Sequence, residues 1–169
     1  MKAQSEILVF VLLFLLSISL FVTTIFWSKD VFQRNVDTTK VYSAEKALKE
    51  IDSGIKELMK FEGYEDVDYK VDGPITLLNE NTLEVRTVIS SDLSLPTYWI
   101  VISSDVSIVR EMLDGDIFRV QLEYPEGDRK IILFTDGPTL AKPEYVKIER
   151  NSTFFENGKP TIKIRITFV

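Results

Sequence analysis

The sequence predicts an α+β fold: one long N-terminal helix, followed by an antiparallel β-sheet or sandwich. Three observations predict it. Residues 7–27 form an uncharged apolar run, a helical spacing of apolar residues continues to about residue 62, and residues 63–169 contain short alternating segments separated by turns. At 169 residues the chain has room for one modest domain plus an anchor, and too little for two full globular domains.

The apolar run reads ILVFVLLFLLSISLFVTTIFW and contains no charged residue. As a helix, residues 7–27 would span roughly 31 Å at about 1.5 Å per residue, which matches a bilayer core of about 30 Å. A core helix of a small soluble domain would have a polar face, whereas this segment is apolar all round. Trp27 closes the run at the depth that indole rings prefer, and Lys29 and Asp30 follow it. The pattern therefore predicts a membrane helix.

Hydroxyl residues interrupt the apolar run at Ser17, Ser19, Thr23 and Thr24. Each hydroxyl can bond back to a carbonyl one turn earlier in its own helix. Alternatively, these small residues line a seam where helices pack closely. The sequence leaves both interpretations open.

The flanks of the run argue against an ordinary secretory signal peptide. Such a peptide has a shorter apolar core followed by a small-residue cleavage site. Here the run is longer and WSKDVFQRN follows it, so we expect the segment to be retained. The small residue stands before the run instead, in Met1-Lys2-Ala3, and Gln4-Ser5-Glu6 comes next.

This arrangement resembles the class III signal sequence of archaeal type IV pilins and related filament subunits. In that family a membrane-embedded aspartic peptidase cuts after a small residue that a basic residue precedes, on the cytoplasmic side of the helix. The resemblance matches Lys2 and Ala3 to those positions and implies Gln4 as the first residue of the mature chain. It further implies that residues 1–3 are a leader. Residues 4–27 would then remain as the helix that first anchors the exported chain and later forms the core of a polymer.

Glu6 permits two interpretations. A carboxylate at the start of a membrane helix is costly unless it is paired or lies at the interface. At the interface it would stabilise the helix N-terminus through the macrodipole, with Ser5 as a local cap. The resemblance instead implies that Glu6 neutralises the free amine of a neighbouring subunit during assembly. Many family members carry this acid at the fifth mature position, whereas Glu6 would be the third.

From residue 28 to about residue 62 the sequence predicts that the helix continues and becomes amphipathic. Gly54 is a weak point in it that costs about 1 kcal/mol relative to alanine. The apolar face either covers the domain's own sheet or pairs with another chain in a coiled coil, and its shortness favours the first. This face consists of Val41, Ala44, Leu48, Ile51, Ile55 and Leu58, at spacings of three and four.

Beyond residue 63 the apolar period changes to two, which predicts strands. The clearest alternations are Ile162–Phe168 and Phe118–Tyr124, whereas Val106–Leu113 fits either a short strand or a helical turn. Turn sequences such as Asn157-Gly158 separate the strands, and no βαβ period is present, so we expect antiparallel pairing. Further predicted strands are Asp68–Val71, Leu83–Ile89, Tyr98–Ile102, Lys130–Phe134 and Tyr145–Arg150.

The composition excludes several classes of function. The chain has no cysteine and no histidine, so disulfides, thiolate metal sites and both thiol and imidazole catalysis are excluded. A net charge of -6 disfavours nucleic acid as a primary ligand. The sequence contains no nucleotide-binding glycine motif and no catalytic constellation. We therefore predict neither an enzyme nor a bound cofactor or metal.

Two polar features remain. The acidic stretch from Glu62 to Asp72 lacks the EF-hand pattern, so we interpret it as a solvated loop rather than a calcium site. Asn151-Ser152-Thr153 is a glycosylation acceptor pattern, which makes Asn151 a candidate for glycosylation in an exported protein.

Together these features predict a structural subunit of an archaeal type IV pilus-like surface filament. Residues 7–27 would pack with copies of themselves, residues 63–169 would form an extracellular domain, and a prepilin-peptidase-like enzyme would cut after Ala3. Basic residues flank the apolar run on both sides, so the outward orientation rests on the resemblance. The alternative is a permanently membrane-anchored extracellular protein that binds an envelope component such as an S-layer, or that forms the stationary part of a surface motor.

Overall fold

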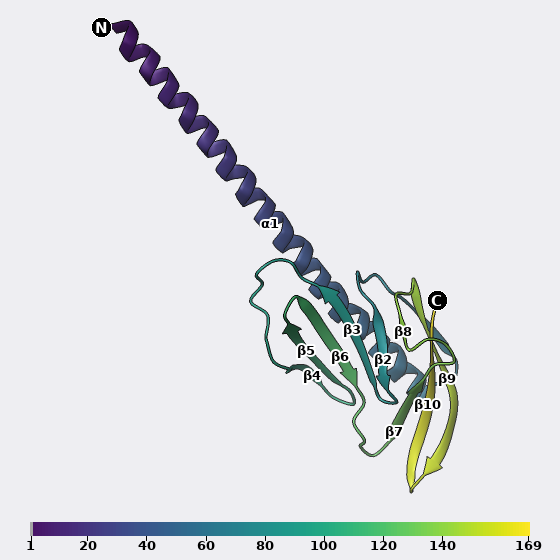
Figure 1. Cartoon of the computed structure of the whole chain (residues 1–169). Helices are drawn as coiled ribbons and strands as arrows, with labels where there is room; N and C mark the ends of the chain where they lie inside the picture. Colours follow the sequence, from purple (N-terminus) through teal and green to yellow (C-terminus); the bar gives the residue numbers. More distant parts are fainter. Residues whose placement is uncertain (1) are drawn as a thin grey trace. The chain divides into compact units, whose positions relative to one another are not determined.

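The computed structural model describes the backbone of residues 2–169 and the side chains of residues 7–169. Within these residues the chain forms one long helix, α1 (Lys2–Lys60), followed by ten strands in two sheets (Figure 1). The predicted α+β class is confirmed. The chain divides into two compact units, Met1–Val36 and Asp37–Val169.

α1 runs without interruption because residues 2–53 contain neither glycine nor proline. The helix also continues through Gly54, the predicted weak point, where a Cβ would lie 3.3 Å from Ile148 Cδ1. Glycine at this position therefore lets the helix approach a strand closely. α1 ends at Lys60, slightly before the predicted end, and Gly63 follows with a φ of 149°.

The larger sheet has six strands in the order β4-β5-β6-β3-β2-β8, and every neighbouring pair in it is antiparallel. Its central strands alternate between core-facing residues such as Val85 and Val120 and outward-facing residues such as Glu84 and Arg119. The strands of this sheet are β2 (Ile75–Asn79), β3 (Thr82–Val88), β4 (Ile100–Ser104), β5 (Ile108–Asp114), β6 (Ile117–Glu123) and β8 (Leu140–Ala141).

The smaller sheet has four strands in the order β1-β9-β10-β7. The β9–β10 turn at Asn157-Gly158 has φ values of 53° and 79°, which agrees with the predicted hairpin turn. β10 and β7 pair in parallel, which the short turns do not predict. Residues 135–158, which separate them, supply the long crossover that a parallel pair needs. The strands are β1 (Tyr64–Asp68), β7 (Lys130–Phe134), β9 (Tyr145–Glu156) and β10 (Lys159–Phe168).

Most of the predicted strands are present with shifted ends. Lys130–Phe134 is β7 with its predicted bounds, and the ambiguous Val106–Leu113 contributes strand β5 rather than a helical turn. The predicted strand Asp68–Val71 is wrong, because β1 ends where that strand was expected to begin. Strand β2, with the sequence ITLLN, is not among the predicted strands.

The apolar face of α1 packs against the chain's own sheets. Ala44, Leu48, Ile51 and Ile55 are fully buried, and Leu58 is 3% exposed. The interpretation that this face covers the domain's own sheet is confirmed, and the coiled-coil alternative is wrong because no surface is left on this face for a second helix. The face shares one hydrophobic core with residues of both sheets, among them Ile75, Leu83, Val85, Val120, Leu122, Ile148, Ile164 and Ile166.

Gly73 should tolerate no side chain. A Cβ on it would lie 1.8 Å from the carbonyl oxygen of Arg86, in the backbone of β3. Because overpacking costs about 1–3 kcal/mol, Gly73→Ala should lower the urea midpoint of the full-length chain in detergent clearly. Gly127→Ala is the matched control, since nothing lies within 4 Å of its Cβ. Equal midpoints for the two variants would contradict the close approach at Gly73.

Candidate functional site

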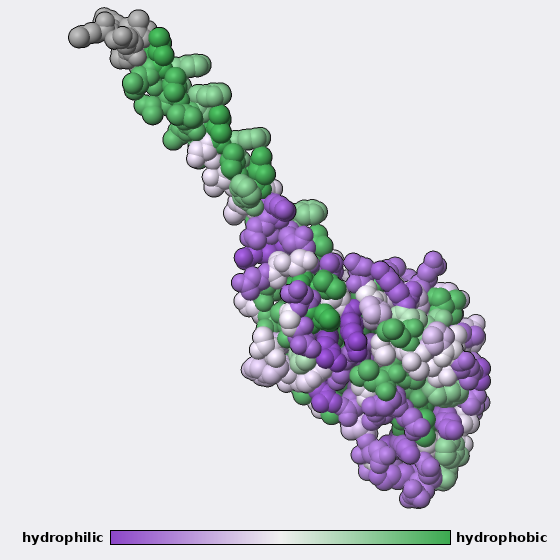
Figure 2. Space-filling model, in the orientation of Figure 1, coloured by the Kyte–Doolittle hydropathy of each residue, from purple (hydrophilic) through white to green (hydrophobic). Residues whose placement is uncertain are grey.

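The apolar segment, residues 7–27, exposes its side chains in the isolated chain. Its large apolar residues are 43–73% exposed, with Val22 at the low end and Phe10 at the high end. In Figure 2 this segment is mostly green, the colour of hydrophobic residues, with some paler residues among them. Among the described residues, α1 contains a stretch that is long and apolar enough to cross a membrane, and none of it is buried. An apolar surface of this extent needs a cover of lipid or protein.

The hydroxyl groups of this segment bond back to their own helix. The bonds are Ser17 Oγ to Leu13 O at 2.8 Å, Thr23 Oγ1 to Ser19 O at 2.9 Å, and Thr24 Oγ1 to Leu20 O at 2.8 Å. The first of the two interpretations is therefore confirmed for these three residues. Because each hydroxyl donates within its own helix, it needs no polar partner from outside.

The residues that the resemblance assigns to processing and assembly are Ala3, Gln4 and Glu6. They belong to the helical backbone of α1, but their side chains lie outside the described residues. Removal of the leader and pairing of Glu6 with a neighbouring amine therefore stay predictions.

Asn151 lies exposed in β9 at a β-bulge. The register with β10 shifts there: Ile164 pairs with Arg150 and Lys163 pairs with Ser152. Asn151, between these two pairs, has no partner residue in β10. The side-chain oxygen of Asn151 accepts a hydrogen bond from Arg165 Nη2 at 3.3 Å. The amide nitrogen, which is the atom that a glycan would modify, takes no part in that bond. The bulge thus presents the predicted acceptor on the surface.

Asp37 has a structural role that the sequence pattern does not predict. Its fully buried carboxylate accepts hydrogen bonds from the backbone N–H groups of Ser90 and Ser91, at 2.9 and 2.7 Å. Lys40 lies 3.6 Å from it and donates to the carbonyl of Val88 at 3.0 Å. Asp37 thereby ties α1 to the loop after β3. The sequence does contain one indication of this role. Asp37 stands four residues before Val41, so it lies on the apolar face of the helix, where a charged residue is unexpected.

A second buried polar link joins α1 to Tyr124, the residue that follows β6. Tyr124 donates to Asp52 Oδ1 at 2.7 Å, and Lys56 lies 2.7 Å from Asp52 Oδ2. Burial raises the pKa of Tyr124 well above its usual value, and the Asp52 carboxylate raises it further. The phenol therefore stays protonated and serves as a donor. This link fixes the helix on the sheet and has the geometry of a structural rather than a reactive group.

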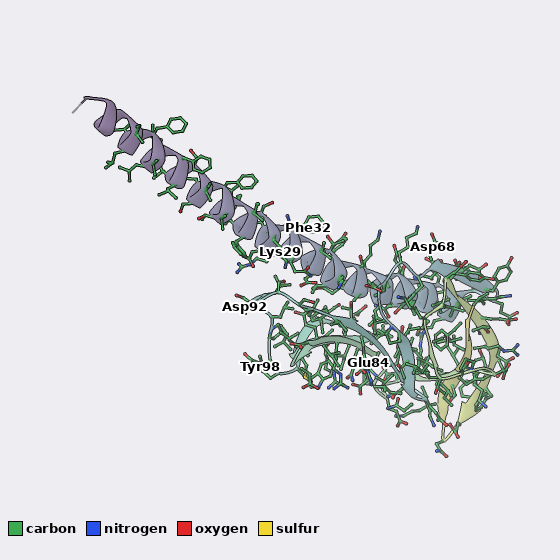
Figure 3. The ribbon with its side chains drawn as sticks, turned by 45° about the horizontal axis from the view of Figure 1, so that its top comes forward. Lys29, Phe32, Asp68, Glu84, Asp92 and Tyr98 are labelled. Carbon is green, nitrogen blue, oxygen red and sulfur yellow. The ribbon has the colours of Figure 1, made fainter. Side chains whose placement is uncertain are left out.

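The outer face of the larger sheet carries an ionic network centred on Glu84 (Figure 3). Glu84 is fully buried beneath Arg86, Arg119 and Gln121, all three of which donate to it. Burial alone would raise its pKa, but these hydrogen bonds outweigh burial and hold the pKa below its ordinary value. Arg119 also lies over the Trp99 ring, 5.6 Å from its centroid. The network leaves the carboxylate saturated, so it has no capacity to act as a base.

The interpretation of the acidic stretch from Glu62 to Asp72 as a loop is wrong in part, because Glu65, Asp66 and Asp68 lie in β1. Two acids of the stretch form separate ion pairs. Lys70 lies 2.7 Å from Asp68, and Lys142 lies 2.8 Å from Asp72. The hydrogen bond and the positive charge of each lysine lower the pKa of its partner carboxyl. Among the residues that the structure describes, no group of three or more acidic side chains is placed to hold a metal ion.

Comparison with known proteins gives no relative: no family model, curated protein or solved structure matches the chain. The candidate site is therefore inferred from the contacts and exposure of the chain's own residues. The polar clusters around Asp37, Asp52 and Glu84 are internally paired. The exposed apolar segment, residues 7–27, is the surface that still requires a partner.

One buried carboxyl group in the domain is poorly satisfied. Glu111 of β5 is 9% exposed, and its Oε2 atom is buried without a hydrogen-bond partner. Burial raises its pKa above the ordinary 4.5, the nearby Glu45 raises it further, and Lys49 partly offsets them. The folded state therefore binds this proton more tightly than the unfolded state. The resulting penalty is absent below the unfolded pKa and grows as the pH rises through the higher folded pKa.

Glu111→Gln should stabilise the chain at neutral pH by removing this penalty. We expect a gain on the order of 1 kcal/mol at about pH 7, which vanishes by about pH 4. Urea unfolding of both full-length proteins at the two pH values measures it. The exposed Glu126, substituted to Gln, is the control and should change little. A variant at Glu111 that is less stable than wild type at neutral pH would refute the buried-charge account.

Proposed function

We propose that the chain is a structural subunit of a type IV pilus-like surface filament. Residues 7–27 hold it in the membrane before assembly and pack with other copies afterwards, while the domain faces outward from the cell. The observation that carries the proposal is the composition of α1. This one helix contains an exposed, uncharged apolar segment and a separate apolar face that is already buried in a folded domain.

The domain's own packing supports self-association through residues 7–27. The apolar face from Ala44 to Leu58 is occupied by the two sheets and is closed to other chains. On the face of the domain that Figure 2 shows, hydrophilic residues predominate and the hydrophobic patches are scattered. A copy of the chain therefore finds its most extensive apolar contact on the segment before the domain. Lipid covers that segment in the precursor, and neighbouring helices replace the lipid in the filament.

Processing after Ala3 connects the two states. The cut removes Met1, Lys2 and Ala3 and leaves an amine at Gln4 beside Glu6, with the membrane helix retained. A carboxylate near the membrane needs a cationic partner, and the amine of a neighbouring copy supplies one. A prepilin-peptidase-like enzyme is the partner that this step requires. The proposal needs no cofactor and no enzymatic activity of the chain itself.

The native protein should begin at Gln4. Intact-mass measurement of chains sheared from cells should show the loss of residues 1–3. Ala3→Leu places a large side chain where the peptidase needs a small one, so this variant should keep its leader and stay in the membrane fraction. Ser5→Ala is the control and should be processed and shed like wild type.

A native chain that still begins at Met1, and that is recovered from membranes alone, would contradict the filament proposal. Such a chain would be a permanently anchored extracellular protein, and its domain would then be tested for binding to envelope components.

We further propose that Asn151 carries a glycan in the exported protein. Its exposure, its place in the bulge of β9 and its uncommitted amide nitrogen support this modification. The residues that complete the acceptor, Ser152 and Thr153, continue along the same strand.

Glycosylation at Asn151 should add a discrete mass to the native protein. Both Asn151→Gln and Thr153→Val should remove that mass, because each destroys the acceptor. Ser152→Ala preserves the acceptor and should keep the mass. If the native protein has the mass of its unmodified polypeptide, Asn151 carries no glycan.

A further inference from the structure

Strand β7 carries apolar residues on both of its faces. Ile131 and Leu133 belong to the hydrophobic core, whereas Ile132 and Phe134 alternate with them and therefore point to the outer face of the smaller sheet. Both outer residues are partly exposed, and β7 stands at the edge of its sheet. Apolar residues on both faces are typical of a strand that is covered on both sides. The outer side of β7 is thus ready to receive a cover.

Arg165 of β10 frames this apolar surface. It pairs with Phe134 in the register of the sheet, and its guanidinium lies over the Phe134 ring, 5.9 Å from the centroid. Two acids hold it in place: Arg165 Nε lies 3.3 Å from Asp136 Oδ2, and Arg165 Nη1 lies 3.9 Å from Glu149 Oε2. The outer face therefore combines an apolar floor with positioned hydrogen-bond donors and acceptors.

The carboxamide of Asn151 lies on the same face. The bulge in β9 separates it from Arg150, whose guanidinium reaches the Leu58 carbonyl of α1 on the inner side, at 3.3 Å. Asn151 Oδ1 instead accepts a hydrogen bond from Arg165 Nη2, also at 3.3 Å. This bond inclines the carboxamide across the sheet, over β10 and toward β7. A sugar on Asn151 Nδ2 would therefore begin above the outer face rather than beyond the edge of β9.

The dimensions and chemistry of the face suit a sugar chain. Neighbouring strands lie about 4.8 Å apart, so roughly 10 Å separates β9 from β7, and an asparagine side chain with its first sugars spans this distance. A pyranose ring has an apolar C–H face and a rim of hydroxyl groups. Its C–H face would pack on Ile132 and Phe134, and its hydroxyl groups would accept hydrogen bonds from Arg165 and from Lys163, the β10 residue that pairs with Ile132.

An attached glycan is favoured over a separate partner because of its position. Tethering holds a group near its binding surface at an effective concentration that a free molecule of modest affinity does not reach. The tether at Asn151 ends on the face that needs the cover, and Arg165 contacts both the asparagine and the Phe134 ring.

We propose that the glycan of Asn151 packs onto the outer face of the smaller sheet and covers Ile132 and Phe134. This inference rests on the proposed glycosylation and adds to it where the sugar lies and which residues recognise it. The glycan becomes part of the folded surface of the domain. It also shields β7, an edge strand with an apolar outer side, from pairing with other chains.

Hydroxyl-radical footprinting of the full-length native protein in detergent tests the contact, since radicals oxidise exposed rings faster than covered ones. The comparison is Asn151→Asp, which removes the attachment atom but keeps an oxygen for Arg165. Thr153→Val removes the acceptor while Asn151 stays in place, so both variants should give the same footprint. Phe155, which is 78% exposed and alternates with the outward-facing Phe154, is the internal control.

We expect Phe134 to be oxidised several-fold more slowly in the glycosylated protein than in either variant, and Phe155 to be oxidised equally in all three. Intact mass shows whether the native protein carries the glycan. Equal oxidation of Phe134 with the glycan present would overturn the packing and leave the glycosylation of Asn151 intact. A native protein without the glycan mass would overturn both proposals.

Discussion

One face of α1 packs against both β-sheets, and the rest of the structure depends on this contact. Burial of Leu48, Ile51, Ile55 and Leu58 stabilises the fold by about 1.5–3 kcal/mol for each side chain, as an upper estimate. The sum of these four contributions is similar to the whole net stability of a typical domain. Without the helix, each sheet would expose its inner face. The chain contains no disulfide to compensate. Because this face is committed to the domain, the apolar segment of residues 7–27 is left to find other partners.

Buried polar groups fix how the helix sits on the sheets. Asp37 holds the backbone of Ser90 and Ser91, and Asp52 holds the phenol of Tyr124. Burying a carboxylate is costly unless its oxygens are satisfied, so each of these groups favours one arrangement of helix and strands over its neighbours. Asp37 also stands at the first position of the compact domain. The folded domain thus begins at a defined residue within α1.

The helix and most strands could be predicted because their signals are local. The apolar face from Val41 to Leu58 has a clear helical period, and Ile162–Phe168 alternates cleanly. The parallel pairing of β10 with β7 could not be predicted, because it depends on contacts distant in sequence. The roles of Asp37 and Glu84 could not be predicted for a related reason. A buried acid looks like a surface acid until the donors that satisfy it are brought to it by the fold.

The exposed apolar segment of the candidate site, residues 7–27, could be predicted from the sequence, because an uncharged run is recognisable by composition alone. The central claim is that this helix serves as the core of a polymer. Electron cryomicroscopy of material sheared from the cell surface tests it most directly. We expect filaments with a core of packed α-helices and with this chain's β domain outside the core. Sheared material that lacks the chain, with all of the chain left in the membrane, would contradict the filament proposal.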